Sequence, residues 1–140
     1  MLRFVCAAAA AAAALAAPIA AGPTPAVHGG GKTNDGARFA LAISGGDGHF
    51  DCLMPAQMTV EATVTAVTSI GASAVTFTGT AAVTLGGKNP FGLPAGPLVR
   101  GEPFVASATA GGPGVGTLDL KILGLDFPGT VENGRISITP

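Results

Sequence analysis

The residues of this chain with the greatest capacity for chemistry lie between Asp47 and Cys52. Asp47, His49 and Asp51 occupy alternate positions, so on an extended strand their side chains would share one face, opposite Cys52. Two carboxylates and an imidazole are ligands that zinc accepts, and calcium would need further oxygens, such as the carbonyls of residues 45–48. One hypothesis is therefore a calcium or zinc site at Asp47, His49 and Asp51. The alternative is a solvated strand face beside a glycine turn.

Nucleophilic catalysis has little basis in this sequence. A cysteine nucleophile needs a base and an orienting group, and His49, three positions before Cys52, would face the other side of a strand. The other histidine, His28, lies in a Gly/Pro-rich stretch, and no pair stands out among the eight acidic residues. The sequence therefore predicts a non-catalytic protein without a cofactor.

The first residues have the layout of a secretory signal peptide, with Arg3, an alanine-rich apolar run and small residues around Pro18. We expect cleavage after residue 21 and a secreted or extracytoplasmic product, with an uncleaved anchor as the alternative. A flexible Gly/Pro leader is expected over residues 22–36. Cleavage removes Cys6, which leaves Cys52 either buried or joined to another chain.

The elements that would position these residues are strands. In residues 58–67 and 75–85 apolar residues alternate with threonines, and this period of two predicts an antiparallel hairpin with one buried face. Similar segments at 37–44, 49–54, 102–110, 117–123 and 134–139 are separated by Gly/Pro turns, and residues 86–101 form a long predicted loop, functional or mobile. About seven strands in residues 37–140 predict one all-β domain, an antiparallel β-sandwich, with a small barrel as the alternative.

Composition narrows the class of partner. The chain has a net charge of −1 with 11% charged residues, which argues against nucleic acid and, in the mature form, against a membrane. It has no Trp and no Tyr, the residues that dominate sugar platforms and protein hot spots. A surface of Thr, Ser, Gly and Ala depends on edge protection to avoid association. We therefore expect a structural or binding module, with self-association or cell-wall contact as candidate roles.

Regularly spaced threonines give one resemblance. Thr76, Thr78 and Thr80 follow one predicted strand, with Thr59, Thr63 and Thr65 on the other. This T-x-T spacing resembles the surfaces of ice-binding proteins. Threonine is also a strong strand former that solvates well, so a plain solvated sheet face is the alternative.

Overall fold

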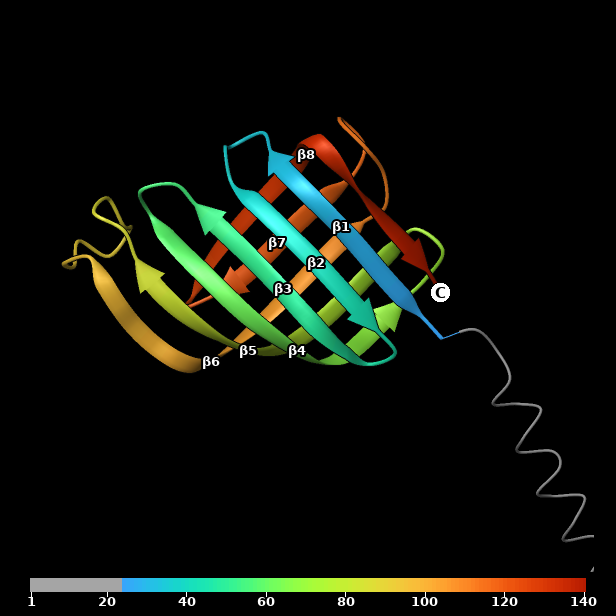
Figure 1. The fold of residues 1–140 in the computed structure, drawn as a ribbon, viewed down its shortest axis with the longest axis horizontal. Coiled ribbons are helices and arrows are strands. Elements are labelled where there is room, and N and C mark those ends of the chain that lie inside the picture. The colour runs from blue at the N-terminus through green and yellow to red at the C-terminus, as the bar shows by residue number, and fades with distance from the viewer. Residues whose placement is uncertain (1–23) are drawn as a thin grey trace, which may run out of the picture.

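The computed structural model describes residues 24–140, which form a closed antiparallel β-barrel (Figure 1). Each strand pairs with its neighbours in the sequence, and the first also pairs with the last. The strands are β1 (Ala26–Thr33), β2 (Arg38–Ser44), β3 (Asp47–Met54), β4 (Met58–Ile70), β5 (Ala74–Leu85), β6 (Gly96–Thr109), β7 (Thr117–Ile122) and β8 (Leu125–Thr139). The all-β prediction is confirmed, and the chain adopts the small barrel rather than the sandwich. The predicted signal peptide, residues 1–21, lies outside the described residues.

The strand that closes the barrel comes from the range predicted as a flexible leader, residues 22–36, and the structure corrects that prediction. Residues 26–33 form β1, which pairs with β2 on one side and β8 on the other. The glycines there allow close approach of two backbones: a Cβ added at Gly31 would lie 1.9 Å from the carbonyl oxygen of Asn133 on β8. Val27 and Thr33 are buried near the two ends of β1. The folded domain therefore begins before Ala37.

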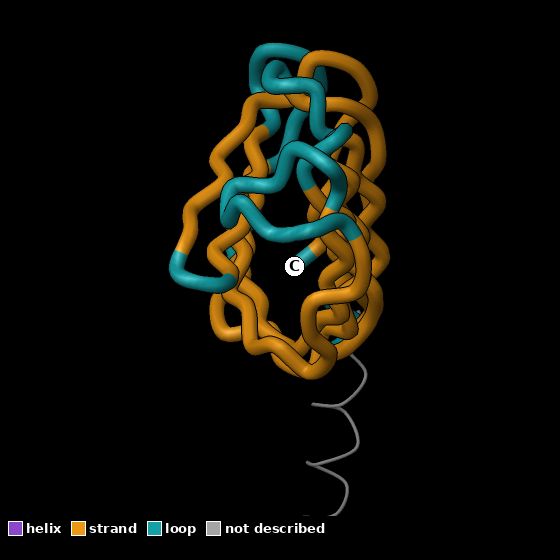
Figure 2. The backbone as a smooth tube through the Cα atoms, turned by 90° about the vertical axis from the view of Figure 1, so that its left-hand side faces the viewer, coloured by secondary structure: helices purple, strands orange, loops and turns teal. Residues whose placement is uncertain are grey.

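The inward side chains of the strands fill the barrel with an apolar core. Phe50, Phe77 and Phe104 contact one another there, with ring centroids 5.7 to 6.2 Å apart. Figure 2 shows the strands surrounding this interior. Among the described residues, Thr33 is the only polar side chain in the buried set. Because the inside is occupied by packed side chains, polar chemistry is confined to the outer wall and the loops.

The β4–β5 hairpin confirms the predicted alternation over most of its length and departs from it at two bulges. The register shifts between Val64 and Ala66 and again between Val67 and Ser69. One extra residue in a strand reverses which positions point inward. Val67, which an unbroken alternation starting at Met58 would turn outward, therefore lies opposite Phe77 and packs against the core.

The predicted loop 86–101 is shorter in the structure, because β6 already begins at Gly96. Asn89 holds the loop together: its Oδ1 accepts hydrogen bonds from the backbone N–H groups of Phe91 and Leu93, and its Nδ2 donates to the carbonyl of Gly86 at 2.9 Å.

In the part of the chain that the structure describes, no helix is long and apolar enough to cross a membrane.

One stretch of β6 lacks a second neighbouring strand. β7 pairs with β6 only from Phe104 onward, so residues 96–103 pair with β5 alone. Pro97 and Pro103 lack an N–H, the register with β5 shifts on both sides of Val83, and Gly101 has a φ of +71°. Prolines and bulges of this kind make a free edge a poor template for another strand.

Candidate functional site

The structure places Asp47, His49 and Asp51 on the outer surface of β3, as the alternation predicts. All three are exposed, while Phe50 and Cys52 point into the core. The β2–β3 hairpin that presents them turns at Gly45 and Gly46, and Gly45 has a φ of +70°, a conformation that glycine adopts without cost.

The three side chains do not form a compact ligand set. Within residues 24–140, no group of three or more His, Cys, Asp or Glu side chains is placed to hold a metal ion. Ligands at alternate positions of one strand start about 6.6 Å apart and point in parallel directions. The calcium or zinc hypothesis for Asp47, His49 and Asp51 therefore stays a prediction from the sequence.

The strand register reveals an arrangement of charges around these residues. On neighbouring strands, Lys32 of β1 lies directly opposite Arg38 of β2. On the next pair, Asp51 of β3 lies directly opposite Glu61 of β4. Like charges directly opposite each other on adjacent strands are destabilising.

Arg135 of β8 adds a third cation beside Lys32. It lies opposite Gly30 of β1, two positions along β8 from Asn133, the partner of Lys32. We call Lys32, Arg38, Arg135, Asp51 and Glu61 together the charged face. Its basic half spans β8, β1 and β2, and its acidic half spans β3 and β4. Figure 1 shows β1 to β4 side by side along one wall of the barrel.

Most of the charged face is free of internal ion pairs. Lys32 Nζ lies 3.3 Å from Glu132 Oε1, and both side chains are about half exposed, so this pair contributes little stability. Among the described residues, no ion pair involves Arg38, Arg135, Asp51 or Glu61. These four side chains are therefore available to an external partner.

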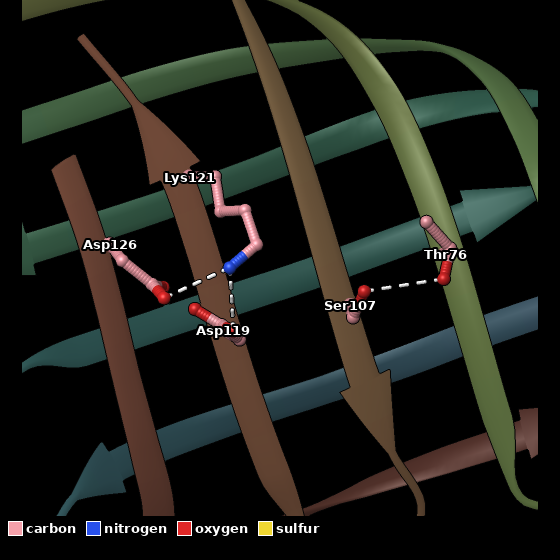
Figure 3. A network of polar contacts seen from close by, with 5 residues as sticks. All are labelled: Thr76, Ser107, Asp119, Lys121 and Asp126. Atoms are coloured by element: carbon pink, nitrogen blue, oxygen red, sulfur yellow. Dashed lines mark hydrogen bonds and ion pairs between the residues drawn. The ribbon is translucent and has the colours of Figure 1, made fainter. Parts of the chain in front are cut away.

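A second cluster of charges is satisfied within the chain. Lys121 Nζ donates to Asp126 Oδ2 at 2.9 Å and to Asp119 Oδ2 at 3.3 Å (Figure 3). The hydrogen bond with Asp126 is the main cause that raises the pKa of Lys121. Burial, followed by the hydrogen bond with Asp126, raises the pKa of Asp119, whereas the same contact lowers the pKa of Asp126. Asp119 Oδ1 is buried without a hydrogen-bond partner in the described residues.

An open groove of about 450 Å³ lies beside this cluster, next to the free edge of β6. Val105, Leu123 and Leu125 give it an apolar lining, and Glu102 and Lys121 stand among the residues around it. Leu123 has a φ of +56° in the β7–β8 turn, which is uncommon for a residue other than glycine. Because Lys121 is held between two carboxylates, it is less free to recognise a ligand than the cations of the charged face.

The threonines of the outer wall do not form a regular array. Thr76 and Ser107 lie 3.2 Å apart through their hydroxyl oxygens (Figure 3). Thr63 lies opposite Thr80 as expected, but Thr65 falls in the bulge between Val64 and Ala66 and has no partner on β5. The twist and the bulges interrupt the regular spacing on which the resemblance to ice-binding surfaces depends.

Cys52 is buried and free, which confirms the first of its two predicted states. A cavity of about 20 Å³ lies beside it and is lined by Thr33, Asp35 and Phe127 among others. Burial is the main cause that raises the pKa of the Cys52 thiol to about 12, and the charge of Asp35 adds to it. The thiol is therefore protonated and poorly nucleophilic at neutral pH.

Sequence reasoning identified the outward residues of β3 but missed the charged face. Alternation places Arg38, Asp51 and Glu61 on outward positions, yet it does not say which outward residues meet across strands. Lys32 and Arg135 lie about a hundred residues apart and meet only through the closure of the barrel by β1 and β8. Comparison with protein-family models, with curated proteins and with solved structures finds no match to this chain.

Proposed function

We propose that this domain is a non-catalytic module of an exported protein, and that it binds a partner through the charged face. Export is the expectation from the predicted signal peptide at residues 1–21. The barrel supplies a rigid scaffold, and its outer wall carries the groups that can recognise another molecule.

The observation that carries this proposal is the division of the charged face into a basic and an acidic half. Lys32 opposite Arg38 and Asp51 opposite Glu61 are two unfavourable pairs. Neither directly opposed pair stabilises the monomer, whereas exchanging Arg38 with Asp51 would give each strand pair opposite charges. Residues that break a local rule of stability are often those that serve function. A partner with complementary charges would offset the repulsion.

Binding to polymers of one charge tests this proposal. Retention of the domain on agarose beads that carry polyphosphate would measure binding by the basic half. Retention on beads that carry polylysine would measure binding by the acidic half. We expect Arg38→Glu to weaken binding to polyphosphate and Glu61→Lys to weaken binding to polylysine, both at low salt, because exposed charges are strongly screened at high salt.

A matched control is available on β6. Arg100 and Glu102 lie outside the charged face and, among the described residues, also have no ion pair. Arg100→Glu and Glu102→Lys make the same changes in net charge. If they reduce bead binding as much as Arg38→Glu and Glu61→Lys do, net charge explains the binding and the proposal is wrong.

The second candidate function is metal binding, or metal-dependent catalysis, at Asp47, His49 and Asp51. An open groove lined by Asp47, His49, Thr63 and Thr65 is the feature of the structure that favours it. It is the weaker candidate because, within residues 24–140, no other strand supplies a further acidic or histidine ligand to this groove. Calorimetric titration with Zn²⁺ and Ca²⁺ tests it directly.

A further inference from the structure

We infer that the partner of the charged face is a second copy of the same chain, docked face to face around a twofold axis. This inference rests on the proposed function, since it names the partner of the same surface. In such a dimer the same patch serves both copies, and each contact occurs twice.

The charges of the face are complementary to those of its own copy. The basic half lies on β8, β1 and β2, and the acidic half lies on β3 and β4. A twofold axis that lies in the interface, parallel to the strands and between β2 and β3, places β2 of one copy over β3 of the other. Arg38 and Arg135 of one copy then approach Asp51 and Glu61 of the other. Both unfavourable pairs of the monomer acquire opposite charges in the dimer.

Small side chains within the basic half allow the walls to approach. Gly30 of β1 and Ala40 of β2 lie in the same row as Asp51 and Glu61, and Ala42 occupies the next outward position of β2. Leu53 is 43% exposed on β3, directly opposite Arg38. An exposed leucine beside small residues provides apolar contact, and the charges around it set orientation.

The other occupants are less compatible with these observations. An anionic polymer would contact the basic half and be repelled by Asp51 and Glu61, which lie on the next strands. Addition of a strand to the free edge of β6 is hindered by Pro97 and Pro103. A second copy is the partner that uses both halves of the face at once.

Two double variants test the dimer. Arg38→Glu with Arg135→Glu makes the face mainly acidic, and Asp51→Lys with Glu61→Lys makes it wholly basic. Sedimentation velocity at several concentrations and two salt concentrations would measure the self-association of each. We expect the wild type to dimerise reversibly, and each double variant alone to associate at least about tenfold more weakly.

Mixing the two double variants separates loss of docking from loss of folding. The acidic face of one variant complements the basic face of the other, so the mixture should form a heterodimer at least as stable as the wild-type dimer, in a salt-sensitive manner. A variant that had unfolded could not be rescued in this way. Arg100→Glu with Glu102→Lys on β6 is the control and should dimerise like the wild type.

Three results would overturn the inference. The wild type could remain a monomer at all concentrations, the mixture could fail to associate although both variants are folded by circular dichroism, or the control could lose the dimer as well. A monomeric wild type whose binding to polyphosphate still depends on Arg38 would reject the second copy as partner and leave the proposed function standing. A monomer whose binding ignores these substitutions would reject both.

Discussion

Replacement of Phe77 by alanine tests the packing of the barrel. Phe77 is fully buried and contacts the rings of Phe50 and Phe104. Burial of roughly 150–250 Å² of aromatic surface at about 25 cal/mol per Å² corresponds to about 4–6 kcal/mol. Phe-to-Ala substitutions in cores cost about 3–5 kcal/mol. Since a domain of this size has a free energy of unfolding of about 5–15 kcal/mol, Phe77→Ala should remove a large part of it.

Urea denaturation followed by far-UV circular dichroism is the suitable assay, because the chain has no Trp or Tyr for fluorescence. Phe91→Ala is the control: Phe91 lies half-buried in the loop between β5 and β6, so its loss should cost less.

The edge-to-face contact between Phe50 and Phe77, with centroids 5.7 Å apart, adds a finer test. A double-mutant cycle with Phe50→Leu and Phe77→Leu should give a coupling of about 0.5–1.5 kcal/mol. A cost below about 1 kcal/mol for Phe77→Ala, or one equal to that of Phe91→Ala, would show that Phe77 does not pack in the core of the barrel.

Three further predictions follow from single sites. Gly79→Ala should destabilise the domain strongly in urea denaturation, because its Cβ would lie 1.9 Å from the Thr63 carbonyl oxygen, whereas Gly87→Ala, with no atom within 4 Å, should have a small effect. Folding raises the pKa of Cys52 from 9.0 to about 12, so between these pH values the folded state binds more protons than the unfolded state. The free energy of unfolding should therefore fall as the pH rises through this window. Cys52→Ala should make that fall smaller, as measured by urea denaturation at each pH. A Cys52→Ala variant with an equally steep fall would contradict the assigned cause. Calorimetric titration with Zn²⁺ or Ca²⁺ should give no heat that depends on His49, and saturable heat abolished by His49→Ala would restore the metal hypothesis.

Several features of the fold could be predicted from local pattern alone. The alternation of Met58, Val60, Ala62 and Val64 with polar residues specifies both a strand and the face that it buries, since the side-chain period of a strand is two. The same reasoning placed Cys52 inside the core and Asp47, His49 and Asp51 outside it. It failed at Val67, because a bulge changes the parity without a recognisable sequence signal.

The closure of the sheet could not be read from the same pattern. In β1, Gly29, Gly30 and Gly31 have no side chains from which alternation could be recognised. Their role is to let β1 approach β8, and it becomes visible only when residues 26–33 and 131–139 are brought together. A sandwich and a barrel have the same alternation in each strand and differ in whether the first and last strands pair.

The amino-acid sequence by itself thus determined the β-class of the domain and the inward or outward direction of most side chains, because these depend on neighbours along one strand. Only the tertiary structure decided that the sheet closes and that Lys32 faces Arg38 while Asp51 faces Glu61. Contacts across strands depend on register and on pairings between distant segments. Hydrophobic alternation constrains the register to steps of two residues but does not select the partner strand. For this reason the charged face is a property of the folded barrel and of no single segment of the chain.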